Sequence, residues 1–358
     1  MVSTVPRLRA LLTAVLLSVG VAAPAAAEWL PGGRVLLDAH NCYPYHGQWS
    51  DRLSRALSVG TPLAIEQDLT WFVDPATGKG RSLVAHDEDD RPNLGLDGSE
   101  PTLDAYFFER IRPLVETALR ENRREAWPLI TLNLDFKTEE PEHLAAVWAL
   151  LQRYRSWLTT APRAATLEEV RPLSVGPVLV LTGESDRQRA AFHDAVPEGQ
   201  ALLVFGAARP ERRSPEVKGE LPDITAGQRT NYHRWWNNPW SAVERGGQPR
   251  ADLWTPDDAR RLQALVDAAH RASLWIRFYT LNGHDAADES GGWSAGYNFG
   301  SSDAATERWR AAIAAGVDFI ATDQYEAFAA VHKSSASRAV ADLADGPVLF
   351  SNAIYVLR

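Results

Sequence analysis

The stretch VLLDAHNCYPYHG, residues 35–47, interrupts an apolar run with Asp38, His40 and Asn41. A strand that serves only as buried structure gains nothing from a titratable imidazole and an amide at its end. An imidazole can transfer protons near neutral pH, and an amide oxygen can bind a hard cation. This run end is therefore a candidate for a functional site.

Other apolar runs carry charged or titratable residues in comparable places. The second long run contains Glu66 and Asp68, and the third ends in Asp135 and Lys137. Residues two apart in a strand point to the same side, so each pair shares one face. His86 follows another short apolar run in RSLVAHDED. These residues match one another in position, which predicts a common site.

Clustered carboxylates raise one another's pKa unless a cation balances them. We therefore predict one divalent cation, Ca²⁺ or Mg²⁺, because oxygen-only ligands select a hard ion over zinc. His40 and His86 suit a general acid and a general base on either side of a metal-bound phosphate, and their spacing leaves the two roles interchangeable. The predicted ligands are Asn41, Glu66, Asp68 and Asp135.

Such a site needs a fold that gathers strand ends on one face. Short apolar runs alternate with segments of helical period, which is typical of βα units around a parallel sheet. We predict a TIM-type (β/α)8 barrel, in which catalytic groups come from the carboxyl ends of the strands. The expected strands are 34–40, 62–69, 129–136, 177–183, 201–206, 232–236, 274–281 and 317–323, and the clearest helices are 102–122, 141–154, 255–272 and 303–316.

Composition and the chain ends indicate where the protein works. Residues 1–27 have the layout of a secretory signal peptide, with Arg7 and Arg9, an apolar stretch and small residues before Glu28. We therefore expect a secreted or periplasmic protein, with the barrel over 28–333 and a C-terminal extension packed on it over 334–358. Removal of the leader takes the formal charge from −9 to −11, which argues against nucleic acid as a partner.

The segments AHN, EQD, AHDED, LDFK and AGVDFIATDQ resemble the superfamily of glycerophosphodiester phosphodiesterases and phosphatidylinositol-specific phospholipases C, over roughly residues 34–330. The chain is similar to a branch that keeps His-Asn in place of His-Arg-Gly. The resemblance implies a TIM-type barrel that cleaves phosphodiesters with a divalent cation and two histidines. It matches His40 and His86 with the catalytic pair, and Asn41, Glu66 and Asp68 with metal ligands.

The chain departs from the family pattern in two places. The usual glutamate of the third strand is Asp135, and the Pro-Glu-Asn segment after the first histidine is missing. His40-Asn41 favours the phospholipase side, where a substrate hydroxyl attacks phosphorus and gives a cyclic product. His86-Asp87 favours the glycerophosphodiesterases. The expected partner is thus a phospholipid or a glycerophosphodiester, with room for peripheral membrane contact and no protein partner implied.

Lys137, Arg277 and Tyr279 are expected to contact the phosphate oxygens that the metal leaves free. Alternation along the strand WIRFYTL places Arg277 and Tyr279 on one face. An ion pair inside the barrel is the competing explanation for Arg277. The sequence therefore predicts an exported, metal-dependent phosphoric diester hydrolase.

Two other functional classes remain open. The chain has 13 tryptophans, and the segment NYHRWWNNPW carries Trp235, Trp236 and Trp240. Aromatic platforms and paired carboxylates are typical of glycoside hydrolases and carbohydrate-binding barrels. A catalytically inactive binding barrel is the third class. The GWSAG motif at 292–296 matches a serine-hydrolase nucleophile elbow, but loop-like segments surround it instead of the strand and helix that this elbow requires.

Overall fold

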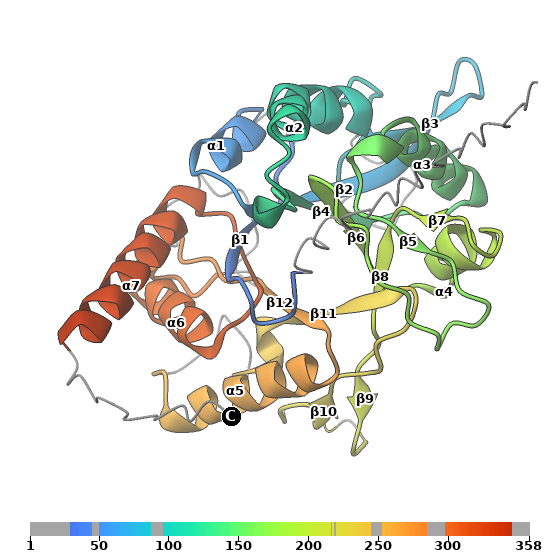
Figure 1. Ribbon diagram of the computed structural model, residues 1–358. Coiled ribbons are helices and arrows are strands. Elements are labelled where there is room, and N and C mark those ends of the chain that lie inside the picture. The colour runs from blue at the N-terminus through green and yellow to red at the C-terminus, as the bar shows by residue number, and fades with distance from the viewer. Residues whose placement is uncertain are drawn as a thin grey trace, which may run out of the picture.

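The computed structural model describes residues 29–44, 50–86, 96–215, 217, 220–244, 253–284 and 298–345, with side chains described as far as 335. Within these residues eight parallel strands form a closed barrel, because β2, the last parallel strand in the sheet order, pairs back with β1. Helices surround this barrel (Figure 1). The predicted TIM-type barrel is confirmed. Its strands are β1 (Leu36–Ala39), β2 (Leu63–Val73), β4 (Ile130–Phe136), β6 (Val178–Thr182), β8 (Phe205–Ala207), β11 (His233–Pro239), β12 (Trp275–Tyr279) and β13 (Phe319–Thr322).

The helices begin and end close to the predicted positions. Thr255 caps α5 in a capping box with Asp258, and Gly316 ends α6 in the left-handed conformation. The helices are α1 (Arg52–Ser58), η1 (Asp104–Phe108), α2 (Glu109–Glu121), η2 (Arg124–Ala126), α3 (Pro141–Arg153), η3 (Arg155–Trp157), α4 (Asp186–Arg189), η4 (Ala190–Asp194), η5 (Trp240–Ala242), α5 (Pro256–Arg271), α6 (Ser302–Ala315) and α7 (Tyr325–Asp345). None of the described helices is both long and apolar enough to span a bilayer.

The fifth predicted strand differs from the structure. Residues 201–206 form two separate pieces, because β7 (Ala201–Leu202) pairs antiparallel with β5 (Ala161–Pro162) outside the barrel. The barrel position is taken by β8, which lies between β6 and β11. A continuous apolar run does not reveal which of its residues pair with the barrel. The remaining short strands are β3 (Gly80–Val84), β9 (Glu211–Arg212) and β10 (Ile224–Thr225).

The interior of the barrel has an apolar lower layer and a polar upper layer. Leu36, Ala64, Trp235, Trp275 and Phe319 pack together at the amino ends of their strands. Because side chains alternate between the two faces of a strand, the inward positions nearer the carboxyl ends are those two and four residues later. On these strands most of the later positions carry polar side chains, among them Asp38, Glu66, Asn237, Arg277 and Asp323. The apolar layer thus forms the floor beneath the polar groups.

An antiparallel arm extends the second strand beyond the barrel. Strand β2 continues to Val73 and pairs with β3. His143 of α3 ties this arm to the barrel, because its Nε2 lies 2.8 Å from Ser82 Oγ and its Nδ1 lies 3.0 Å from the Thr138 carbonyl oxygen. The imidazole is fully buried, and burial lowers its pKa from 6.5 to about 4.

This histidine makes the stability depend on pH. Its pKa is lower in the folded chain, so between pH 6.5 and about 4 the unfolded chain takes up a proton that the native imidazole does not. We expect this to remove about 3 kcal/mol of the free energy of unfolding as the pH falls across this range. Urea denaturation of the parent and of His143→Gln at several pH values measures the difference. Parallel profiles for the two proteins would contradict the assignment.

The regions named from the sequence that lie outside the described residues are the leader 1–27, residues 45–47 of the first stretch, residues 87–89 of AHDED with Asp87, the GWSAG motif and the final segment 346–358. Helix α7 runs through the predicted boundary at 333/334 and continues to Asp345. Its first part contacts α1, α6 and β1, so it covers the side of the barrel where the first and last strands meet.

Candidate active site

Barrel closure brings the first histidine against an aspartate from the last strand. Ala39 of β1 is in register with Thr322 of β13, and the next residues along are His40 and Asp323. His40 Nδ1 lies 2.7 Å from Asp323 Oδ1, and both side chains are buried. Burial would raise the pKa of the Asp323 carboxyl, but the nearby His40 outweighs this effect and lowers the pKa. The carboxylate therefore accepts the hydrogen bond and Nδ1 donates it.

The other ring nitrogen of His40 faces a second carboxylate. Its Nε2 lies 3.4 Å from Glu66 Oε2. Burial alone would lower the pKa of His40, but Glu66 and Asp323 together raise it above its usual value. The ring of Tyr279 stacks on His40 at a centroid distance of 6.5 Å. The imidazole is therefore fixed in place and holds its proton more tightly than a free histidine.

Asn41 adopts a left-handed backbone conformation, with φ of 51°. Asparagine tolerates this region better than most residues. The turn lets the Asn41 N–H donate to Glu66 Oε2 at 3.0 Å, while its carbonyl accepts from Arg52 at 2.7 Å. The side-chain Oδ1 accepts from the Tyr43 hydroxyl, 3.0 Å away, and Nδ2 faces Asp323. Asn41 thus shapes the site through its backbone, and its predicted role as a metal ligand stays a prediction.

Three carboxylates converge beside the histidine. Strands β2 and β4 pair with Asp68 opposite Asp135, and Glu66 lies two residues before Asp68. One oxygen from each of these three residues lies within 4.8 Å of the others. The sequence-predicted acids are therefore brought together, from adjacent strands and on one face.

Lys137 bridges two of these acids. Its Nζ lies 2.7 Å from Asp135 Oδ2 and 3.0 Å from Asp68 Oδ2, and these carboxylates raise the pKa of the ammonium against the effect of burial. Burial, reinforced by Asp135 and Glu66, raises the pKa of Asp68 to about 7 although Lys137 opposes it. Asp68 therefore ionises less readily than an ordinary aspartate.

Arg277 supplies the second internal cation. It forms ion pairs with Asp38 and with Glu66, whose Oε1 lies 3.0 Å from its NH2, and its NH1 donates to Asn237. Burial opposes ionisation of Glu66, but His40 and Arg277 outweigh it and lower its pKa to about 2. The guanidinium is buried in these ion pairs. The structure thus shows the internal ion pair that the sequence left open as an alternative to a substrate contact. Its predicted contact with phosphate stays a prediction.

The donor set at Glu66, Asp68 and Asp135 fits a hard divalent cation. All its atoms are carboxylate oxygens, and Asp68 Oδ1 is buried without a hydrogen-bond partner. Such an unsatisfied buried oxygen is costly, and coordination would satisfy it. Lys137 now holds one oxygen each of Asp68 and Asp135, so an ion has to share these acids with the ammonium.

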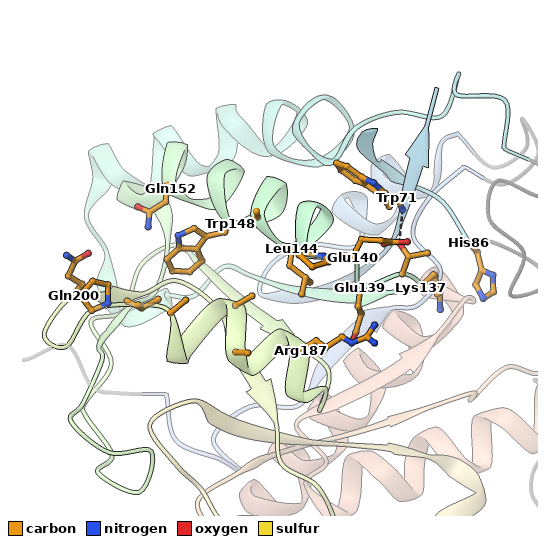
Figure 2. A pocket seen from close by; sticks show the side chains of 18 residues that line it. Trp71, His86, Lys137, Glu139, Glu140, Leu144, Trp148, Gln152, Arg187 and Gln200 are labelled. Carbon is orange, nitrogen blue, oxygen red and sulfur yellow. Dashed lines mark hydrogen bonds between the residues drawn. The ribbon is translucent and has the colours of Figure 1, made fainter. Parts of the chain in front are cut away.

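His86 comes one residue after a backbone contact with the strand that carries Asp68. The Ala85 N–H donates to the Asp68 carbonyl at 3.0 Å, which fixes the chain just before His86. His86 and Lys137 both line the same pocket, and Figure 2 shows their side chains at one end of it. The role of His86 as the second catalytic histidine stays a prediction.

Sequence reasoning missed Asp323 and Tyr43 as members of the site, and it named Asp38 without giving it a role. Tyr43 joins two parts of it, because its hydroxyl lies 2.8 Å from Asp68 Oδ2 and 3.0 Å from Asn41 Oδ1. The available signal for Asp323 was its place as the last residue of the last predicted strand, the same place that His40 has in the first.

Comparisons with known proteins give fold-level likenesses. Neither a family model nor a curated protein matches the chain. A glycerophosphoryl diester phosphodiesterase from Parabacteroides distasonis is similar, with a TM-score of 0.40 and 15% identity over 84% of this chain and 87% of that one. For a calcium-dependent phosphoinositol-specific phospholipase C from a Pseudomonas species the values are 0.44, 14%, 85% and 93%.

A third similar structure is HPPK-DHPS from Plasmodium falciparum, with a TM-score of 0.40 and 6% identity over 86% of this chain and 49% of that one. The first two proteins are named for the two activities that the sequence motifs resemble, and the third is not. At these scores and identities the likenesses carry no argument about chemistry, so the function has to be judged from the site.

Removing the charge of Asp323 should change the titration of His40. We expect Asp323→Asn to lower the pKa of His40, because one of the two carboxylates that stabilise the imidazolium is lost. NMR titration of the histidine ring protons measures the shift, with His332 as an internal control outside the site. An unchanged His40 titration would contradict the pairing.

The carboxylate cluster should bind one Ca²⁺ or Mg²⁺ ion per chain. Glu66→Gln and Asp68→Asn should each weaken this binding by more than about 100-fold, since each removes a direct ligand. Isothermal titration calorimetry measures the affinity. Glu139→Gln is the matched control, because this carboxylate bonds Ser185 and Gln188 instead of the cluster. Equal affinity in all four proteins would place the ion elsewhere.

Proposed function

We propose that this protein is an exported, metal-dependent phosphoric diester hydrolase. The observation that carries the proposal is the arrangement around His40, which is oriented by Asp323 on one side and faces the Glu66, Asp68 and Asp135 cluster on the other. An oriented imidazole beside a hard-cation site is suited to proton transfer at a phosphate. The sequence motifs and the barrel fold agree with this function.

In this proposal His40 transfers protons, and the carboxylate cluster, through its cation, and Lys137 bind the phosphate. Asp323 holds His40 Nδ1–H, so proton transfer takes place at Nε2, which points toward the cluster. A divalent cation on Glu66, Asp68 and Asp135 would bind a non-bridging phosphate oxygen and offset the charge of Glu66 near His40. Lys137 is partly exposed at the edge of the cluster, in a position to contact a second phosphate oxygen.

Cleavage of the phosphodiester needs two proton transfers, and two histidines can supply both. The oxygen of water, or of a substrate hydroxyl, forms a bond to phosphorus as the bond from phosphorus to the leaving oxygen breaks. One histidine takes the proton of the attacking group and the other gives a proton to the leaving oxygen. In this proposal His40 and His86 are the pair, with the assignment of base and acid open to either. A substrate hydroxyl as nucleophile gives a cyclic phosphodiester and water gives a monoester.

The glycosidase alternative loses its aromatic platform in the structure. Trp235, Trp236 and Trp240 are at most 1% exposed, and Trp235 belongs to the floor of the barrel. A platform for sugar stacking has to be accessible. Glu66 and Asp68 do have pKa values that burial and charge push apart, but Arg277 and Lys137 already occupy these carboxylates.

Activity should depend on His40 and on the cation. We expect the parent to hydrolyse at least one member of a panel of phosphodiesters, with loss of turnover in chelator and recovery on adding Ca²⁺ or Mg²⁺. His40→Ala should lower kcat by at least about 100-fold, the usual effect of losing a general acid or base. Steady-state assays with product analysis measure both.

His332→Ala is the matched control, since His332 lies on α7 and lines a pocket at the other end of β1. It should keep the activity of the parent. Turnover that survives both chelation and His40→Ala would exclude this mechanism, and hydrolysis of a glycoside by the parent would favour the glycosidase alternative.

A further inference from the structure

A long groove runs outside the barrel between α3 and the segment α4–η4. Its volume is about 1100 Å³, at the upper end of the range for small-molecule sites. Figure 2 shows His86 and Lys137 at one end and Gln152 and Gln200 at the other. The groove is thus much larger than a phosphate and its two ester oxygens require.

The lining changes from polar to apolar along the groove. The end at Lys137 also carries Glu139 and Arg187. On α3 the lining positions recur every three or four residues, so they form one stripe that faces the groove. Beneath it Trp148 stacks on Phe192 of η4, at a centroid distance of 6.2 Å, and Phe192 is fully buried. The apolar lining includes Leu144, Ala145, Trp148, Ala191, Val196 and Pro197.

The polar end of the groove is continuous with the candidate active site. Lys137 lines the groove, and the same ammonium lies 3.0 Å from Asp68 and 2.7 Å from Asp135. His86, the predicted second histidine, lines the groove as well. A molecule whose phosphate lies at the cluster can therefore extend directly into the apolar part.

We propose that this groove binds one hydrocarbon chain of a lipid phosphodiester whose phosphate lies at the candidate active site. The inference rests on the proposed function, and it selects the lipid over the water-soluble substrate. The distribution of lining fits such a molecule, because charged groups are confined to the end where the phosphate lies, apolar groups follow, and the far end carries the uncharged Gln152 and Gln200. The chain gains affinity by leaving water, at about fourfold per buried methylene.

Helix α3 offers a matched pair of variants. Ala145 is exposed and lines the groove, whereas Ala146 is exposed on another face of the same helix. Ala145→Trp should fill the groove, and Ala146→Trp adds the same ring where no groove lining lies. Both positions are solvent-accessible, so neither substitution displaces core residues, and thermal unfolding checks that both variants fold.

The experiment compares two ligands that differ by one chain. Calorimetric binding of lysophosphatidylcholine with an eight-carbon chain, below its micellar concentration, is set against binding of glycerophosphocholine, with Ca²⁺ present. Each protein also carries His40→Ala to suppress turnover. We expect the chain to tighten binding at least about 50-fold, since only part of it has to be buried to reach this gain. Ala145→Trp should reduce the gain below about threefold, while Ala146→Trp keeps it.

The outcomes separate this inference from the proposed function. A chain that adds less than threefold in affinity, or a gain that survives Ala145→Trp, overturns the groove as a chain site. Turnover of both compounds by the parent protein, which keeps His40, is followed in parallel by product analysis. Chain-dependent binding with no turnover of any phosphodiester supports the groove and contradicts the proposed function. Turnover without chain-dependent binding supports the proposed function and contradicts the groove as a chain site.

Discussion

The structure depends on how buried carboxylates are balanced by cations at the mouth of the barrel. Burying an unpaired carboxylate is costly, so each one needs a partner close by. Arg277 serves Asp38 and Glu66, and Lys137 serves Asp68 and Asp135. The remaining carboxylate is Asp323 at the end of the last strand, and it pairs with the imidazole of His40 at the end of the first strand. These pairs fix the geometry of the site, and the unsatisfied oxygen of Asp68 leaves a place for one further cation.

The pairs that the sequence predicted lie within one strand or on strands that are close to each other along the chain. Glu66 with Asp68, and Asp135 with Lys137, share a face because the side-chain period of a strand is two. The pairing of His40 with Asp323 spans 283 residues and arises only when the barrel closes. Periodicity gives no information on such a contact. The fifth strand was misplaced for a related reason, because an apolar run does not show where its partner strand begins.

Several residues have a structural role in addition to the one proposed for them from the sequence. Asn41 was expected to offer its amide oxygen to a metal, which stays a prediction, and its left-handed backbone also directs its N–H to Glu66. Burial raises the pKa of the Cys42 thiol to about 12, which agrees with a packing residue. Arg277 neutralises the interior. The same positions therefore support the fold of the mouth and the chemistry proposed for it.

The most direct test of this account is anomalous diffraction from crystals soaked with Mn²⁺, a stand-in for the predicted ion. The account predicts one strong peak among the carboxylates of Glu66, Asp68 and Asp135, with His40 Nε2 facing the same space and the Lys137 ammonium moved away from at least one acid. A peak at some other place on the chain, or an undisturbed Lys137 bridge with no ion beside it, would contradict the claim that these groups share a divalent cation.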